Sequence, residues 1–191
     1  MKLLAFTDLH LDFDSLREIK KNAKDADILV CAGDFTVFGR NTKLILEKIN
    51  KLGKKVILIP GNHEDEDVVE KECKKLPNIL YIHKKAIEIN GFLFVGWGGG
   101  GFALVDREFE KFTSKFENKK NIILITHAPP YKTKLDLLWE HRGCKSITNF
   151  IKKAKVLLAI SGHFHENFGE IDYVGKSVLV NPGPDGMIIE I

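Results

Sequence analysis

Polar residues able to bind metal ions follow five apolar runs of the sequence, each close to the end of its run. These residues are Asp8, His10, Asp34, Asn62, His127, His163 and His165. Carboxylate, imidazole and one amide oxygen, without a thiolate, suit Mn, Fe, Ni, Co or Zn better than calcium or an iron–sulfur cluster. Seven donors are too many for one tetrahedral ion. If one carboxylate bridges, they divide into two sites, which is the arrangement of two-metal hydrolases.

The apolar runs that precede these residues are typical of buried strands. They lie at 3–6, 28–32, 56–59, 122–125 and 156–160, and they are rich in Ile, Val and Leu. Helical spacing of apolar residues between them predicts helices near 16–23, 45–52, 109–116 and 147–154. In a parallel α/β sheet the loops beyond the carboxyl ends of the strands meet at one edge. Residues as distant in sequence as Asp8 and His165 can therefore meet in a single crevice.

Two further segments predict antiparallel strands. Residues 86–89 and 92–96 flank Asn90-Gly91 and indicate a hairpin with a type I′ turn. The tail from 168 to 191 has the pattern of short strands. For the second helix, Asn41 is the expected N-cap and Gly53 the expected stop. The sequence thus predicts an α/β fold with one or two mixed sheets, and residues 1–191 are expected to form a single domain.

Each polar residue has an ordinary explanation when it is taken alone. An Asp after a strand is often a turn former, and a single His is more often a surface residue than a ligand. Turn propensity does not account for such residues at five separate strand ends, four of them beside or near a glycine or proline. The joint placement indicates a functional site.

Five motifs in a fixed order carry a resemblance to a known family. They are D-x-H at Asp8, G-D-x-x-x-x-G from Gly33, G-N-H-E from Gly61, T-H-A-P-P around His127, and G-H-x-H from Gly162. This set resembles the calcineurin-like metallophosphoesterase superfamily, and more narrowly its small phosphoesterases related to the Icc cyclic-nucleotide phosphodiesterase. The resemblance runs from residue 4 to about residue 184.

The resemblance implies a fold and a set of residue roles. The fold is a four-layer αββα sandwich of two mixed sheets flanked by helices, with the site at one end of the sheets. Asp8, His10 and His165 would hold one metal ion, Asn62, His127 and His163 the other, and Asp34 would bridge them. The turn Asn181-Pro182-Gly183 resembles a loop that lies near the site in the family, and it is equally well explained as a simple turn between strands.

The resemblance also implies a role for two residues outside the metal shell. His63 would stabilise the charged transition state and help the leaving oxygen to acquire a proton. Glu64 would orient the imidazole of His63. The family more often has Asp at that position, so Glu64 is a departure from its pattern.

The expected activity is hydrolysis of a small phosphodiester, or of a monoester, by attack of a metal-bridging hydroxide. The cofactors would be two divalent transition metal ions, with Mn favoured. One alternative is a non-catalytic scaffold on the same fold, like the retromer subunit with a degraded metal site, but here the full ligand set is present. The other is a nuclease, and the chain carries no extra domain or long basic surface of the kind nuclease members have.

Composition limits the expected partners and the expected compartment. The net charge is only +3 and the lysines are scattered, so nucleic acid is permitted as a partner but not indicated. The three cysteines, Cys31, Cys73 and Cys144, form no C-x-x-C pair, which fits a reducing compartment. No apolar stretch is long enough to span a bilayer, so a cytoplasmic enzyme is expected. The oligomeric state is not predicted.

The amino-acid usage is typical of a protein adapted to high temperature. The chain contains no glutamine, while Lys, Ile and Glu are plentiful. This bias is seen in proteins adapted to high temperature, and adaptation of this kind is a hypothesis that a melting midpoint would test.

Three remaining features lie outside the motifs. The run from Gly96 to Gly101 satisfies G-x-G-x-x-G, but it follows a predicted hairpin instead of opening a βαβ unit, so a dinucleotide site is not expected. His83 is expected at the surface. His141 could reach a substrate.

Overall fold

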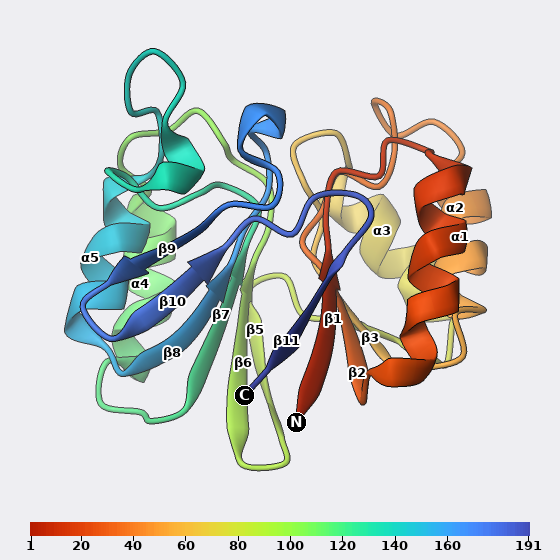
Figure 1. Ribbon diagram of the computed structural model, residues 1–191, viewed down its shortest axis with the longest axis horizontal. Helices are drawn as coiled ribbons and strands as arrows, with labels where there is room; N and C mark the ends of the chain where they lie inside the picture. Colours follow the sequence, from red (N-terminus) through yellow and green to blue (C-terminus); the bar gives the residue numbers. More distant parts are fainter.

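The computed structural model describes residues 1–191. Two β-sheets lie face to face at its centre, and helices cover both outer faces (Figure 1). Apolar side chains fill three spaces: the gap between the sheets, and the space between each sheet and its helices. The strands between two apolar layers are buried on both faces, and this is why they read as unbroken apolar runs. The predicted four-layer αββα sandwich is confirmed.

The first sheet has five strands in the order β11-β1-β2-β3-β4. Their bounds are β1 Lys2–Phe6, β2 Ile28–Cys31, β3 Val56–Leu58, β4 Ile79–Tyr81 and β11 Met187–Glu190. Strands β1 to β4 run parallel, and β11 pairs antiparallel with β1 at the edge. The strands expected at 3–6, 28–32 and 56–59 are all present. Strand β4 was not expected, because three residues after a proline-containing turn carry little periodic signal.

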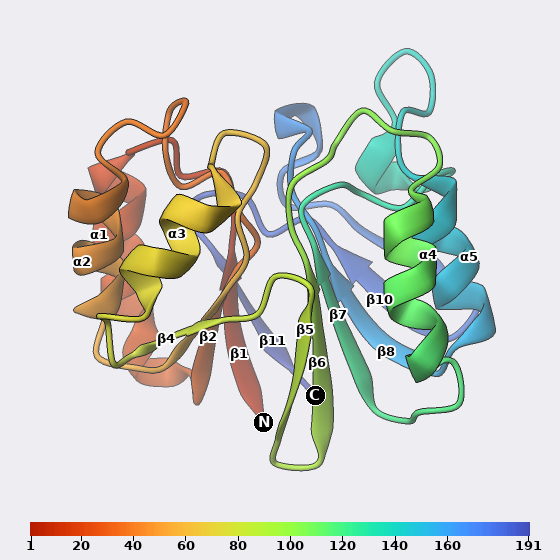
Figure 2. The same ribbon diagram turned by 180° about the vertical axis from the view of Figure 1, so that it is seen from behind.

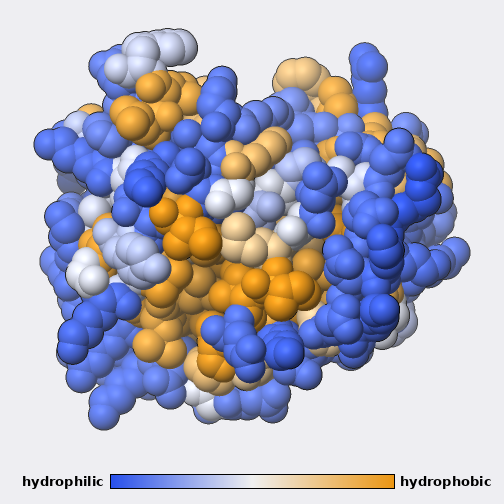
Figure 3. All heavy atoms as spheres, viewed as in Figure 1, coloured by the Kyte–Doolittle hydropathy of each residue, from blue (hydrophilic) through white to orange (hydrophobic).

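The second sheet has six strands in the order β5-β6-β7-β8-β10-β9. Their bounds are β5 Lys85–Ile89, β6 Phe92–Trp97, β7 Ile122–Thr126, β8 Val156–Ile160, β9 Ile171–Val174 and β10 Ser177–Val180. The predicted hairpin is confirmed: Asn90 and Gly91 have φ of 53° and 79°, as a type I′ turn requires. Ile171 in β9 and Ile188 in β11 are 42% and 43% exposed. Figure 3 shows apolar atoms at the surface on this side of the molecule.

Three α-helices cover the first sheet and two cover the second (Figures 1 and 2). The α-helices are α1 Phe13–Asn22, α2 Thr42–Asn50, α3 Glu66–Cys73, α4 Arg107–Thr113 and α5 Lys145–Lys153, and the 3-10 turns are η1 Ala23–Asp25, η2 Ser114–Phe116, η3 Lys134–Asp136 and η4 His165–Asn167. Helix α3 was not expected, because only Val69 and Cys73 are buried and they make no apolar stripe. None of the helices has the length and apolar composition that crossing a membrane requires.

The predicted start of α2 is met in position but not in mechanism, and the helix ends three residues before the predicted stop at Gly53. Asn41 stands at the N-cap, yet its φ of 55° is left-handed and its side chain makes no capping hydrogen bond. The helix ends at Asn50, and Gly53 follows with a φ of 86°. The start of α1 shows the capping that α2 lacks, since the Asp12 carboxylate accepts from the backbone N–H groups of Asp14 and Ser15.

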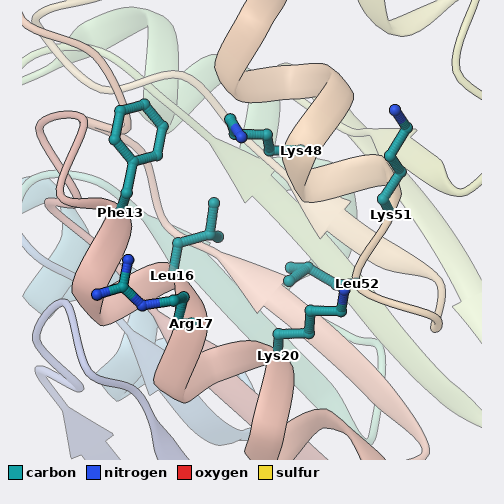
Figure 4. Close-up of a pocket in the computed structure, with 7 residues that line it drawn as sticks. All are labelled: Phe13, Leu16, Arg17, Lys20, Lys48, Lys51 and Leu52. Atoms are coloured by element: carbon teal, nitrogen blue, oxygen red, sulfur yellow. The ribbon is translucent and has the colours of Figure 1, made fainter.

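Helices α1 and α2 pack side by side and leave a shallow groove of about 310 Å³ between them (Figure 4). Its lining residues are Phe13, Leu16, Arg17, Lys20, Lys48, Lys51 and Leu52. The long stems of the basic residues cover the leucines while their charged ends stay in water. The Lys48 ammonium lies 5.2 Å from the centre of the Phe13 ring. The groove is explained as the solvated seam between two helices.

The loops after β2 and β3 approach each other so closely that two glycines meet. A Cβ on Gly33 would lie 2.5 Å from the backbone nitrogen of Gly61, and Gly33 has a φ of 98°. Only glycine tolerates both the contact and the backbone conformation. These two loops carry Asp34 and Asn62, so their close approach brings the first two parts of the site together.

We expect Gly33→Ala to lower the free energy of unfolding by about 2–4 kcal/mol, from backbone strain and overpacking together. Gly53→Ala is the control, because Gly53 also has a left-handed φ, of 86°, but no atom within 4 Å of an added Cβ. It should cost only the strain, about 1 kcal/mol. Urea unfolding measures both, and equal losses would contradict the close-contact explanation.

Candidate metal centre

The candidate residues come from loops at the carboxyl ends of strands in both sheets. Asp8 and His10 follow β1, Asp34 follows β2, and Asn62, His63 and Glu64 follow β3; His127 follows β7, and His163 and His165 follow β8. Three groups of these side chains bring possible ligand atoms within 4.8 Å of one another: Asp8, His10 and His165; His10, Asp34 and His63; and Asp34, His127 and His163. The structure therefore gathers the residues that the sequence predicted.

Asp34 stands at the middle of the cluster. Its side chain is almost fully buried, and its Oδ2 lies 3.8 Å from Nε2 of His10 and 3.3 Å from Nε2 of His127. Its Oδ1 accepts a hydrogen bond of 2.9 Å from the backbone N–H of His63. One carboxylate oxygen thus faces imidazoles from two different sheets.

One flank of Asp34 holds Asp8, His10 and His165. The Nε2 atom of His165 lies 3.6 Å from Oδ1 of Asp8 and 3.2 Å from Nε2 of His10. The Nδ1 of His10 is 2.9 Å from the carbonyl oxygen of Thr36, so Nδ1 carries the proton and donates. The Nε2 lone pair of His10 then points at the other two side chains, as it would toward a bound cation.

The other flank holds Asn62, His127 and His163. The Nδ1 of His127 is 2.9 Å from the carbonyl oxygen of Ala32 and donates to it. Its Nε2 lies 2.9 Å from Oδ1 of Asn62, so that two acceptor atoms face each other unless a proton or a cation lies between them. Both ring nitrogens of His163 are buried without any hydrogen-bond partner. A divalent ion at this position would satisfy all three side chains.

The charges of the cluster also favour cations. Burial alone would raise the pKa of Asp34, but His127 and the N–H of His63 outweigh it and lower the pKa to about 2. Burial would likewise lower the pKa of His127, yet the carboxylates of Asp34 and Asp8 raise it to about 9. Without a metal ion, the imidazole of His127 is therefore protonated and positively charged at neutral pH. Burial, with the charge of His127 added, lowers the pKa of His163 to about 4 and leaves its imidazole neutral.

Several residues of the cluster have strained backbones. Asp8, His10, Asp34 and His163 have φ values of 53°, 42°, 50° and 76°. This left-handed conformation costs a non-glycine residue about 1–2 kcal/mol. Such strain persists where the surroundings hold a residue in place, and it concentrates at functional sites.

Glu64 has a different role from the one that the resemblance implied. Its carboxylate accepts hydrogen bonds from the N–H groups of Gly61, Asp34 and Thr36 and from the hydroxyl of Thr36, at 2.6 to 2.9 Å. These donors belong to the loops after β2 and β3, so Glu64 ties the two loops together. It makes no hydrogen bond to the ring of His63. Burial and the charge of Asp34 raise the pKa of Glu64 to about 7.

The ring of His63 is oriented by Phe38 instead. The backbone N–H of Phe38 donates to Nδ1 of His63 at 3.2 Å, and the two rings stack with their centres 4.3 Å apart. The proton of a neutral His63 is therefore on Nε2, which lies 3.9 Å from Oδ2 of Asp34 and faces the cluster. Sequence reasoning missed Phe38, because nothing distinguishes it from the other variable positions of G-D-x-x-x-x-G.

The remaining polar residues lie around the cluster. The expectation that His83 is a surface residue is wrong: it is only 7% exposed, its Nδ1 accepts from the N–H of Gly98, and its Nε2 contacts the carboxylate of Glu66. His141 lies in the hairpin after β7, with its Nδ1 2.8 Å from Asp136. The turn at Asn181 packs on the site loops, since its side-chain N–H donates to the carbonyl of Phe164.

Comparison with known proteins identifies the family. A family model described as calcineurin-like phosphoesterase matches residues 1–167. The chain belongs to the calcineurin-like phosphoesterase family. The uncharacterized protein MJ1162 of Methanocaldococcus jannaschii is 32% identical to this phosphoesterase family member, over 99% of this chain and 91% of the relative. A protein of Coxiella burnetii named as a probable cyclic nucleotide phosphodiesterase is 26% identical, over 88% of this chain and 77% of the relative.

Solved structures share the fold of this calcineurin-like phosphoesterase. The protein TT1561 of Thermus thermophilus superposes with a TM-score of 0.78 at 18% identity, over 96% of this chain and 90% of that chain. A structure described as a novel archaeal phosphodiesterase has a TM-score of 0.60 at 17% identity, over 96% and 84% of the two chains. At these identities the comparison establishes the fold.

We expect Glu64→Gln to loosen the two loops that Glu64 joins. An amide can turn only one acceptor oxygen to the four donors, and its NH₂ group would face N–H groups. The expected loss is about 1–3 kcal/mol in the free energy of unfolding, measured in urea at pH 8, above the pKa of Glu64. Glu18→Gln, at an exposed position of α1, is the control. An unchanged unfolding midpoint in Glu64→Gln would show that this carboxylate does not hold the loops.

We expect Asp34→Asn to reduce metal binding more than any change outside the cluster. The substitution keeps the shape but removes the charge and one strong acceptor between the two flanks. After loading with Mn²⁺ and desalting, the variant should retain less than half of the wild-type metal, as measured by plasma mass spectrometry. Asp14→Asn, at an exposed position of α1, should bind as the wild type does. Full metal content in Asp34→Asn would refute a bridging role.

Proposed function

We propose that this phosphoesterase hydrolyses a small phosphodiester, or a monoester, with the help of two divalent metal ions. Asp8, His10 and His165 would hold one ion, Asn62, His127 and His163 the other, and Asp34 would bridge them. The observation that carries the proposal is the pair of buried nitrogens of His163, which have no hydrogen-bond partner although the carboxylate of Asp34 and the ring of His127 lie beside them. Buried polar atoms left without a partner in such a cluster are explained by a bound cation.

The donor set suits Mn, Fe, Ni, Co or Zn, and we favour Mn because oxygen donors accompany the imidazoles. When bound, two such ions would neutralise the charge of a phosphate ester and lower the pKa of a coordinated water from about 15.7 toward 7. Asp34 would bridge through Oδ2, the oxygen that faces both His10 and His127, while its Oδ1 accepts from the backbone N–H of His63. Asn62 would supply an oxygen without adding negative charge near an anionic substrate.

His63 is the residue that we assign to the leaving group. Phe38 holds Nδ1 of His63 as an acceptor, so the Nε2 proton faces the cluster. That N–H can stabilise charge on the phosphate and pass a proton to the departing oxygen. Glu64 supports this arrangement indirectly, by fixing the loops that carry Asp34 and His63.

A diester is favoured over a monoester on two grounds. The relative in Coxiella burnetii and the archaeal structure are both described as phosphodiesterases. A diester also carries less charge than a monoester, which suits a site that contains two aspartates of its own. A scaffold without activity is disfavoured because every residue of the proposed donor set is present.

We also propose that residues 1–191 act as one domain, because the proposed ligands come from both sheets.

The proposal is tested by hydrolysis of bis-p-nitrophenyl phosphate and of p-nitrophenyl phosphate. We expect release of p-nitrophenol with Mn²⁺, no release with excess chelator, and recovery when Mn²⁺ is restored. The diester should be the better substrate by kcat/KM. A protein that binds Mn²⁺ but hydrolyses neither compound would favour the scaffold alternative.

We expect His63→Ala to keep its metal and to lose turnover. General acid and charge-stabilising groups contribute about 10²–10⁴ in rate, so kcat should fall by roughly that factor. Plasma mass spectrometry on the same preparation should find the wild-type Mn²⁺ content. Loss of metal together with activity would mean that His63 is a ligand and that its role is misassigned.

A further inference from the structure

An apolar cleft opens beside one end of the metal centre. It has a volume of about 320 Å³ and is lined by Phe102, Leu138, Arg142 and Phe164. Two of its walls touch the proposed ligand His163: the rings of Phe102 and Phe164 have their centres 4.8 and 4.6 Å from the centre of its imidazole. A group attached to a phosphate at the metal centre can therefore enter the cleft directly.

The loop after β6 and the hairpin after β7, which carry Phe102 and Leu138, expose more apolar surface than a solvated loop needs. Phe102 is 81% exposed and Trp139 is 84% exposed, and Leu104, Val105 and Leu137 are each exposed by about half. These residues come from the loop after β6 and the hairpin after β7. Figure 1 shows the hairpin as the teal loop projecting at the upper left, and Figure 3 shows apolar atoms gathered there. Exposed apolar groups that gather around a cavity mark a binding site.

The hairpin is held in place by a buried carboxylate. Asp136 is fully buried and accepts from the N–H groups of Lys132, Thr133 and Gly143, and its Oδ1 lies 2.8 Å from Nδ1 of His141. These four donors around one buried carboxylate fix the base of the hairpin. Farther along the hairpin, an antiparallel β-bridge joins Leu137 to His141. Leu138, two residues after Asp136, is therefore held in a fixed position by this hydrogen-bonded base. At the rim, Arg142 is paired with Glu140.

The two ends of the metal centre differ. At the end nearer His10, the ring of His63 lies 4.7 Å from that of His10 and is covered by Phe38. At the other end His163 is bordered by the cleft. With His63 beside the leaving oxygen, the leaving group belongs at the Phe38 end. In an in-line displacement the attacking water lies opposite the leaving oxygen, so the retained ester group lies to one side of the phosphorus, and the cleft beside His163 and Phe102 has room for it.

We propose that this cleft binds the retained ester group of a phosphodiester and selects an apolar group of ring size. The proposal rests on the proposed function and narrows its substrate class. In the reaction, a water oxygen forms a bond to phosphorus, the bond from phosphorus to the leaving oxygen breaks, and that oxygen takes a proton and departs as an alcohol. The product is a monoester that still carries the ring held by Phe102.

The test compares two diesters with the same leaving group, phenyl p-nitrophenyl phosphate and methyl p-nitrophenyl phosphate. The Mn²⁺-loaded wild type should prefer the phenyl compound in kcat/KM by roughly tenfold, the worth of burying one aromatic ring at a partly open site. In Phe102→Ala the preference, which is the ratio of the two kcat/KM values, should fall to about twofold or less. Leu138→Asn changes another lining residue and should lower the ratio in the same way. Tyr173→Ala removes an exposed ring on β9 and should leave the preference intact.

Binding provides a readout that does not depend on turnover. By calorimetry, Phe102→Ala should bind diphenyl phosphate roughly tenfold more weakly than the wild type, and the loss for diphenyl phosphate should be several times the loss for dimethyl phosphate. An unchanged preference and unchanged binding in both cleft variants, or equal losses for ring and methyl compounds, would overturn the proposal while the hydrolase remains. A wild type that hydrolyses neither diester would instead overturn the proposed function, and calorimetry would still decide whether the cleft takes a ring.

Discussion

The site depends on the packing of two sheets whose strands end at the same edge. Strands β1, β2 and β3 belong to one sheet, and β7 and β8 to the other. A shared apolar layer, with Ala5 and Val30 on one side and Ile123 and Ile160 on the other, sets the distance between them. Asp34 comes from the first sheet and His127 from the second, and they meet across this boundary at 3.3 Å. The candidate metal centre is therefore a property of the interface between the sheets, and a shift of either sheet would separate the two halves of the cluster.

The loops at this edge hold the donors in place without the regular hydrogen bonds of helices or strands. Carbonyl groups of Thr36 and Ala32 accept from His10 and His127 and so turn the Nε2 lone pairs inward. The carboxylate of Glu64 gathers donors from two loops. Left-handed backbones at Asp8 and Asp34 aim their carboxylates at the centre. Each of these features constrains the geometry before any ion binds, and preorganised ligands lose less entropy on binding.

The sequence predicted the parts of the fold that repeat a simple pattern. The five buried strands after which the candidate ligands stand, the Asn90-Gly91 hairpin and four of the helices follow from periodicity and turn chemistry, because burial on one or both faces produces a regular apolar pattern. Helix α3 and strand β4 are short and partly exposed, so they produce no such pattern. The clustering of the candidate ligands was also predictable, because these residues stand next to strand ends and glycines.

Other features depend on contacts between distant segments and could not be predicted. Burial of His83 requires the loop at Gly98 and the side chain of Glu66 to close over it. The hydrogen bonds of Glu64 differ from the implied contact because its carboxylate accepts from Gly61, Asp34 and Thr36 instead of from the ring of His63. The cleft at Phe102 combines two loops whose sequences show no shared pattern. Such features follow from tertiary packing, which periodicity and motifs do not encode.

The geometry around Asp34 leads us to expect a metal ion on each of its two flanks. Crystals soaked in Mn²⁺ and measured by anomalous scattering test this most directly. We predict two anomalous peaks roughly 3.5–4 Å apart, one beside Asp8, His10 and His165 and one beside Asn62, His127 and His163, with Asp34 contacting both. A single peak at saturating Mn²⁺, or peaks that do not touch Asp34, would contradict a bridged two-metal centre.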